Sequence, residues 1–226
     1  MYWFDHVLVV VFAVLLPFHG WRQYPLFIEL VKRNPKVVRR NVYISNIIML
    51  WLMAIVVLAV WNYAQRSYTD LGLVSISGAP GFVSIIVAII LIAMIIQYYK
   101  AILKSERKLQ WVFVPELLPR TNTELKLFIY LSATAGITEE ILFRGYLMWY
   151  LLHFGNIGFA ILLSSVLFTS AHAYQGLKAV LIIFPVALIL CFLYVYSQSL
   201  LVPMLLHIAI NSYAGIFGQK MLANSE

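Results

Sequence analysis

Six polar residues lie inside long apolar stretches of the C-terminal half. They are Glu139, Glu140, Arg144, His172, His207 and Asn211. A charge at the centre of a membrane helix costs roughly 2.5–3.5 kcal/mol on insertion scales. We therefore expect these side chains to pair with one another, to face the interior of a bundle, or to do both.

The spacing of the first three separates two tasks. Glu140 and Arg144 are four residues apart, so on a helix they share one face and can form an ion pair. Glu139 points about 100° away from Glu140. Arg144 can therefore hold one carboxylate while the other stays free to react. A structural salt bridge between Glu140 and Arg144 is compatible with a catalytic Glu139.

The remaining polar residues belong to two further stretches. His172 follows Phe168 by four residues, and Asn211 follows His207 by four. We expect His172, His207 and Asn211 to lie deep in their stretches. Together with the glutamates they supply a carboxylate base, two imidazoles and an amide, which suffice for water activation and oxyanion stabilisation. The other three histidines lie near the ends of their stretches and are interpreted as interfacial or structural: His6, His19 and His153.

The composition places these residues in a lipid bilayer. Of the 226 residues, 63% are hydrophobic and 11% are charged, whereas soluble domains carry about 25% charged residues. A soluble globule, a disordered chain and a disulfide scaffold are excluded. Spanning a bilayer takes about 20 apolar residues, and seven continuous stretches are candidates: 2–21, 43–61, 81–99, 125–152, 157–174, 177–197 and 200–218.

The sequence thus predicts an all-α, polytopic transmembrane bundle of about seven spans, since β-barrels need short alternating segments. We divide it into N-terminal membrane helices with a basic interfacial loop, residues 1–114, and catalytic membrane helices, residues 115–218. Both form one integrated domain. The polar segment 100–124 is interpreted as an interfacial helix or ordered loop, or equally as a solvated basic loop.

The positions of the charges predict an orientation. Basic residues gather between the first and second stretches and between the third and fourth, so both loops are expected to be cytoplasmic. The N-terminus is then outside and Lys220 inside. The first stretch lacks the basic start of a secretory signal and is taken as a mature helix.

The expected partner of the protein is a lipid bilayer, and the expected location is a bacterial inner membrane. No nucleic acid is expected as a partner. The sequence predicts no oligomeric state.

Three motifs carry a resemblance to a known family. Glu139–Arg144 reads EEILFR, Phe168–His172 reads FTSAH, and His207–Asn211 reads HIAIN. They resemble the EExxxR, FxxxH and HxxxN motifs of the CPBP family, in the same order and each in its own apolar stretch. This family includes the type II CAAX prenyl proteases and the bacteriocin-processing or Abi proteins. The resemblance covers roughly residues 115–218.

The resemblance implies an intramembrane endopeptidase of the glutamic type. Glu139 would be the general base for a water that His172 helps to position. His207 and Asn211 would stabilise the tetrahedral oxyanion. Glu140 would be oriented by Arg144, with Phe168 packed beside the site.

Alternatives remain for the metal content and for the function. No cofactor is expected, but a divalent metal such as zinc could be held by Glu139, His172 and His207. The substrate could be a prenylated CAAX-like C-terminus, a bacteriocin leader or a C-terminal sorting segment, in each case a membrane-associated peptide or protein. A non-catalytic immunity or scaffold protein of the same family is the main functional alternative, and a transporter is a further one, although no internal repeat is found.

Overall fold

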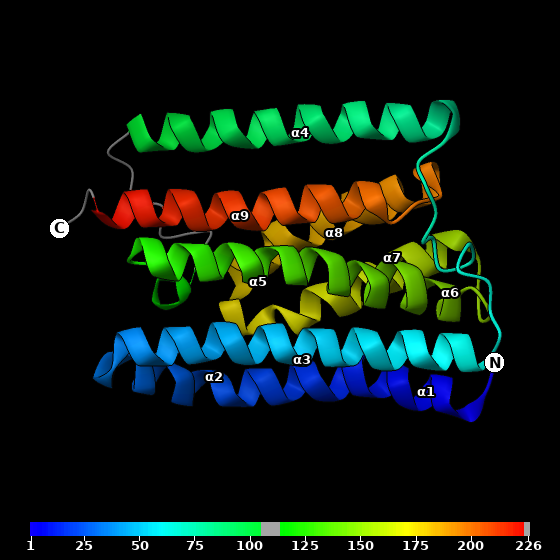
Figure 1. The fold of residues 1–226 in the computed structure, drawn as a ribbon, viewed down its shortest axis with the longest axis horizontal. Coiled ribbons are helices and arrows are strands. Elements are labelled where there is room, and N and C mark those ends of the chain that lie inside the picture. Colours follow the sequence, from blue (N-terminus) through cyan, green and yellow to red (C-terminus); the bar gives the residue numbers. More distant parts are fainter. Residues whose placement is uncertain (105–113, 224–226) are drawn as a thin grey trace.

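The computed structural model describes residues 1–104 and 114–223. These residues form seven roughly parallel helical rods, some of them interrupted (Figure 1). The first three rods are α1 (Trp3–Val10) continued by the π-helical η1 (Val11–Leu15) and α2 (Leu16–Arg33), then α3 (Pro35–Tyr63), then α4 (Gly78–Lys104).

The C-terminal part adds four rods. After the 3-10 turn η2 (Pro115–Leu117), they are α5 (Asn122–Glu140) continued by the π-helical η3 (Ile141–Leu147) and α6 (Met148–Leu151), then α7 (Ile157–Ala171) with the 3-10 turn η4 (Ala173–Gln175), α8 (Leu177–Ser197) and α9 (Leu201–Ala223). The prediction of an all-helical polytopic bundle is confirmed, and the described residues contain no strand.

Five of the rods are long and apolar enough to cross a membrane: Trp3–Arg33, Pro35–Tyr63, Gly78–Ile102, Leu177–Ser197 and Leu201–Ala223. The helix α7 is apolar but shorter. The rod that contains Glu139, Glu140 and Arg144 is not among the five, because its charges lower its hydropathy. The protein is an integral membrane protein, and the full count of seven spans stays a prediction.

The helix α5 occupies the centre of the bundle. It packs between α3 and α9, and α4 covers α9 and α8 from the outside (Figure 1). Behind this layer, α7 packs against α8 and against α2. The segment of this rod that follows Glu139 is therefore enclosed by protein, and residues 140–148 are all buried.

Local sequence signals fix the ends of these helices. Thr121 caps α5, since its side-chain oxygen accepts a hydrogen bond from the backbone N–H of Glu124. One residue, Asn34, separates α2 from α3, and Pro35 occupies the first turn of α3, where the missing N–H costs nothing. The left-handed conformation of Gln198 ends α8. These short connections force neighbouring helices to run antiparallel.

A buried cluster around Asp5 joins the N-terminal rod to the central rod at one end of the bundle. The buried Asp5 accepts hydrogen bonds from Arg66 at 2.8 and 2.6 Å and from the Tyr146 hydroxyl at 2.6 Å. Burial alone would lower the pKa of Arg66, but its contacts with Asp5 hold that pKa above its usual value. The guanidinium also lies 4.2 Å from the centre of the Trp149 ring.

A second ion pair lies at the opposite end. Arg39 contacts both carboxylate oxygens of Glu124 at 3.1–3.3 Å, and both side chains are buried. Glu124 also accepts a hydrogen bond from the backbone of Arg120. Arg39 was counted among the loop charges in the sequence, but it joins α3 to the start of α5.

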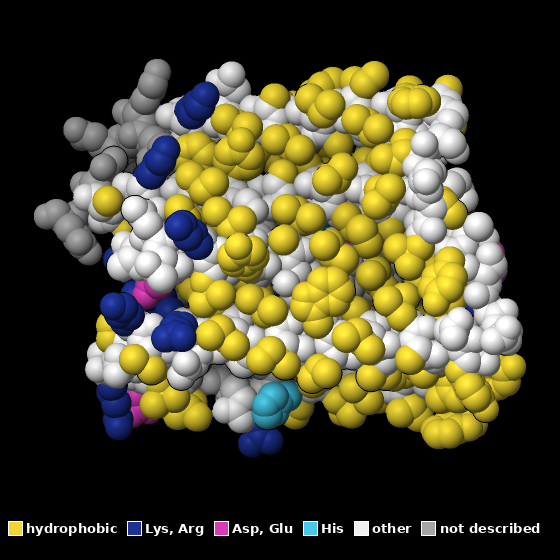
Figure 2. Space-filling view, viewed as in Figure 1, with side chains coloured by type: hydrophobic (Ala, Val, Ile, Leu, Met, Phe, Trp, Pro, Cys, Tyr) yellow, Lys and Arg dark blue, Asp and Glu magenta, His cyan; other side chains and the backbone are white. Residues whose placement is uncertain are grey.

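Lysine and arginine side chains gather at the end of the molecule where α3 and α5 begin, and hydrophobic side chains cover the middle (Figure 2). This matches the grouping of basic residues on which the predicted orientation depends. Residues 105–113 of the predicted interfacial segment 100–124 lie outside the described residues.

Candidate active site

A close contact between α5 and α9 brings the polar residues of these two helices together. A Cβ atom at Gly136 would lie 2.9 Å from the backbone nitrogen of Ile208 and even closer to its side chain. Gly136 precedes Glu139 by one turn, and Ile208 follows His207. The absence of a side chain at residue 136 therefore lets the glutamates reach the histidine.

The pairing predicted for Glu140 and Arg144 is present. Arg144 Nη1 donates to Glu140 Oε1 at 2.8 Å, and both side chains are fully buried. Arg144 Nη2 also lies 3.3 Å from the carbonyl oxygen of Ala187 on α8, and its guanidinium lies 4.3 Å from the centre of the Phe168 ring. Contacts with three helices thus hold the Glu140–Arg144 pair.

A π-helix begins directly after Glu140. Segments of this kind occur often at functional sites, because the wider turn displaces side chains and carbonyls from the α-helical pattern. Here Ser164 on α7 donates a hydrogen bond to the carbonyl oxygen of Phe143 at 3.0 Å. The second π-helix, η1, packs Phe12 against the rings of Phe143 and Tyr146. The irregular segment is therefore supported from two sides.

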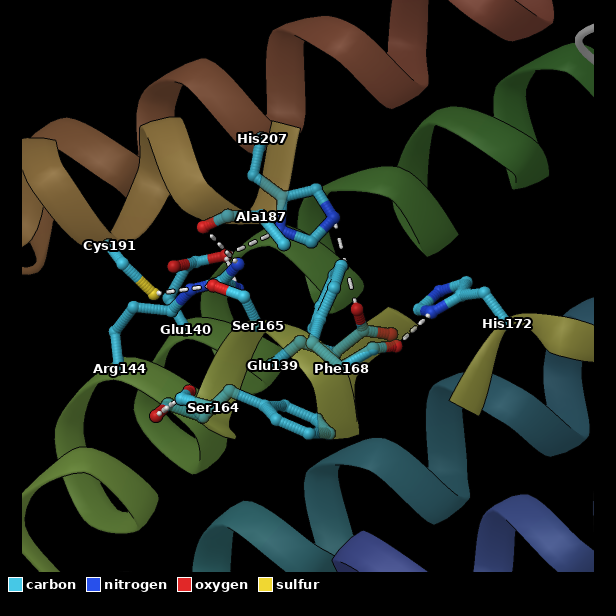
Figure 3. A network of polar contacts seen from close by, with 11 residues as sticks. Glu139, Glu140, Arg144, Ser164, Ser165, Phe168, His172, Ala187, Cys191 and His207 are labelled. Carbon is cyan, nitrogen blue, oxygen red and sulfur yellow. Dashed lines mark hydrogen bonds and ion pairs between the residues drawn. The ribbon is translucent and has the colours of Figure 1, made fainter. Parts of the chain in front are cut away.

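His207 links the two glutamates (Figure 3). Its Nδ1 lies 2.7 Å from Glu140 Oε1, and its Nε2 lies 3.8 Å from Glu139 Oε2. Arg144 donates to the same oxygen of Glu140, so this carboxylate is the acceptor and Nδ1 of His207 carries the proton. In a neutral ring Nε2 then has a free lone pair on the side of Glu139.

Glu139 faces a cavity, whereas Glu140 does not. The cavity has a volume of about 510 Å³, and Glu139, His172, His207 and Asn211 all line it. Glu139 Oε2 is buried and has no hydrogen-bond partner among the described residues. The division predicted from helical spacing, with one glutamate held and the other free, corresponds to this arrangement.

The expectation that His172 lies deep in a helix was wrong. His172 is the C-cap residue of α7, and after it the chain turns through η4 to Gly176, which has a positive φ of 95°. The ring folds back so that Nδ1 donates to the carbonyl oxygen of Phe168 at 2.8 Å. Nδ1 must therefore carry the proton, which leaves Nε2 as the unprotonated nitrogen of a neutral ring.

The remaining two predicted residues lie at the same place. Phe168 is buried, and its ring contacts both His172 and His207. Asn211 is half-buried on α9, and its amide makes no hydrogen bond with another described residue. The structure thus brings together all seven residues that the sequence analysis selected.

Sequence reasoning missed most of the cavity wall. Residues of α2 and α3 complete it, although these helices had matched only as generic membrane spans: Gly20, Gln23, Tyr24, Phe27, Val42, Tyr43, Asn46 and Leu50. The polar Gln23 and Asn46 inside long apolar helices were the only available signal. Side chains from distant helices meet here through tertiary packing, which local spacing does not reveal.

The zinc alternative can be compared with this geometry. Among residues 1–104 and 114–223, no three side chains of His, Cys, Asp and Glu form a group suited to a metal ion. Glu139, His172 and His207 thus do not form such a group in this arrangement. Whether the reaction depends on a metal stays a prediction, which removal of divalent cations tests.

Residues 121–213 match the family described as type II CAAX prenyl endopeptidase Rce1-like. All three sequence motifs lie in this segment, which belongs to that family, as the motifs predicted. The match supports a CAAX-type membrane protease at the level of the family. Comparisons with curated proteins and with solved structures gave no match.

Proposed function

We propose that this protein is a membrane-embedded endopeptidase in which Glu139 activates a water molecule. The observation that carries this proposal is the free Glu139 carboxylate, which faces a cavity while the neighbouring Glu140 is fixed by two donors. A general base must reach its substrate water and must not be consumed by a structural ion pair. Glu139 meets both requirements, and Glu140 meets neither.

The reaction begins with proton transfer from water to Glu139. The resulting hydroxide attacks the carbonyl carbon of the scissile peptide bond, and a tetrahedral oxyanion forms. The unprotonated Nε2 of His172 is available to accept a hydrogen bond from the water and to orient it. Glu139 then gives its proton to the leaving amine nitrogen, which completes hydrolysis and restores the carboxylate.

Two groups on α9 are available to stabilise the oxyanion. The Asn211 amide is a donor whatever the pH, and it has no competing partner among the described residues. His207 donates from Nε2 only when its ring carries both protons, because Nδ1 already donates to Glu140. Glu140 and Arg144 therefore act through His207, by fixing the orientation of its ring.

The proposed substrate is a membrane-associated peptide whose cleavage site enters from the basic side of the bundle. The cavity extends from Glu139 to Leu117 and Leu118, near the start of α5. This is the end at which lysine and arginine gather (Figure 2), and the positive-inside rule assigns it to the cytoplasm. A bacterial inner membrane is the location that we propose.

Cleavage of a synthetic prenylated peptide tests this function. Purified protein in liposomes would be mixed with a labelled peptide that ends in an S-farnesylated Cys-Val-Ile-Met sequence. Wild type is expected to release the last three residues, and Glu139→Gln is expected to release none. Glu29→Gln is the matched control, since Glu29 is an exposed glutamate of α2 outside the cavity, and it should cleave as wild type does.

The host membrane provides a test that presumes no substrate. Terminal peptides would be profiled in cells that express equal amounts of wild type and of Glu139→Gln. Termini that are lost in the variant identify the activity and the class of substrate. Equal profiles under several growth conditions, together with no cleavage of the farnesylated peptide, would contradict the proposal and favour an immunity or scaffold role.

A further inference from the structure

A tyrosine hydroxyl that no motif includes lies in the same cavity as Glu139. Tyr174 belongs to the turn η4, two residues after His172, and it lines the cavity. Glu139 and His172 line this same cavity. Its position therefore relates it to the reacting group and not only to the packing of the turn.

The hydroxyl has a proton that no described residue accepts. Gln175 Nε2 donates to the Tyr174 oxygen at 3.3 Å, so this contact uses the oxygen as an acceptor. A phenol with an ordinary pKa near 10 keeps its proton at neutral pH. Half-buried tyrosine hydroxyls normally find a partner. Since the side chain lines the cavity, a ligand in the cavity is able to accept a hydrogen bond from this hydroxyl.

The ring of Tyr174 is held in place from a distant part of the chain. Tyr24 on α2 packs against it, with ring centres 5.2 Å apart. Tyr24 lies outside the segment that matches the family. A fixed aromatic ring loses little conformational freedom when its hydroxyl binds a ligand, so this arrangement suits a binding group.

Tyr174 and the oxyanion donors belong to different walls. The turn η4 packs against α2 and α8, whereas His207 and Asn211 belong to α9. Successive residues of an extended peptide alternate in direction. A peptide whose scissile carbonyl faces α9 therefore presents the carbonyl of an adjacent residue to another wall, where a donor is needed.

We infer that Tyr174 is a substrate-binding residue whose hydroxyl donates a hydrogen bond to a backbone carbonyl next to the scissile bond. This inference rests on the proposed peptidase function. Gln175 supports the orientation of the hydroxyl, and Tyr24 supports the ring. Because the contact exists in the bound peptide before reaction begins, it contributes to binding rather than to the rate of the chemical step.

Binding to an inactive protein tests the inference directly. The labelled farnesylated peptide would be titrated into Glu139→Gln and into Glu139→Gln/Tyr174→Phe, both in liposomes. Loss of one hydrogen bond predicts a Kd about 3- to 10-fold higher in the second protein. Tyr130→Phe in the same background is the matched control, since Tyr130 lies on α5, is 69% exposed and does not line the cavity, and its Kd should not change.

Peptides with single amide-to-ester replacements locate the contact. An ester carbonyl is a weaker acceptor, so one replacement next to the scissile bond should weaken binding to Glu139→Gln. The same replacement should have no effect when Tyr174→Phe is also present. A purely structural role would give equal penalties in both proteins, and that result, or an unchanged Kd, would overturn the inference. If wild type does not cleave the unmodified peptide and the terminal-peptide profiles of wild type and Glu139→Gln are also equal, the proposed function itself fails.

Discussion

Two buried clusters of charge contact the central rod, and they differ in how completely their atoms are paired. Near α6, each carboxylate oxygen of Asp5 accepts two hydrogen bonds, from Arg66, Tyr146 and the backbone of Tyr2. One turn after Gly136, in contrast, Glu139 Oε2, Glu140 Oε2 and Arg144 Nε are buried without a partner.

This difference separates a structural cluster from a reactive one. Buried polar atoms are nearly always hydrogen-bonded, so the unpaired atoms around Glu139 require an explanation. A site that must bind a water and a peptide carbonyl keeps some of its groups uncommitted until the substrate arrives. The Asp5 cluster has no such groups and fastens the first rod to the central one.

Replacing Arg144 should have the largest effect on the folded protein. Arg144→Ala leaves the buried Glu140 without its cation, and breaking a buried pair costs about 3–5 kcal/mol. Thermal unfolding in detergent measures the loss, and peptide cleavage should fall with it because His207 is no longer oriented. The double variant Glu140→Leu/Arg144→Leu should regain stability but not activity. A stable and fully active Arg144→Ala protein would contradict the pairing.

Removing Asp5 should affect stability alone. Asp5→Ala leaves Arg66 and the Tyr146 hydroxyl without their acceptor, with a loss of about 2–4 kcal/mol, less than for Arg144 because Arg66 is partly exposed. Turnover per folded molecule, measured below the unfolding temperature, should equal that of wild type. Loss of turnover at full stability would assign this cluster a role in the reaction.

Adding a methyl group at residue 136 should separate the catalytic helices. Gly136→Ala places a Cβ against the backbone of Ile208, so α5 and α9 must shift, and overpacking of this kind costs about 1–3 kcal/mol. Because the Glu140–His207 contact spans this interface, kcat should fall. Gly20→Ala is the control for the unfolding temperature alone, since no atom lies within 4 Å of its Cβ position although it lines the cavity; an equal loss of stability in both variants would be inconsistent with the close approach.

Removal of divalent metal should have the smallest effect. Among the described residues, no three side chains of His, Cys, Asp and Glu form a group that could hold a metal ion. We expect cleavage of the farnesylated peptide to continue after dialysis against a strong chelator. Activity that is lost on chelation and restored by zinc would show that the reaction needs a metal.

Much of the fold could be predicted because each helix leaves its own apolar stretch in the sequence. The predicted boundaries were least accurate where polar residues continue a helix, as at Arg33, which ends α2 twelve residues beyond the predicted stretch. Neither π-helix could be predicted, since η1 and η3 depend on packing between Phe12, Phe143 and Tyr146. Asp5 and Arg66 were visible as isolated charges, but their pairing depends on tertiary structure.

The candidate site was predictable where chemistry follows helical spacing. The four-residue interval between Glu140 and Arg144 defined both their pair and the freedom of Glu139. The contact from His207 to Glu140 and the wall that includes Tyr24 and Tyr174 were not predictable, because they join helices that are distant in the sequence. For His172 the apolar stretch was misleading, since α7 ends at Ala171 while the predicted stretch continues to residue 174.

The most direct test of this account compares the two neighbouring glutamates in one experiment. Glu139→Gln and Glu140→Gln would be purified identically, and unfolding temperature and peptide turnover would be measured for each. Glu139→Gln should keep the unfolding temperature of wild type and lose about 10²–10⁴-fold in turnover, as removal of a general base does. Glu140→Gln should unfold at a lower temperature, because Arg144 loses its charged partner. A Glu139→Gln protein that cleaves at the wild-type rate would contradict the assignment of the free carboxylate as the catalytic base.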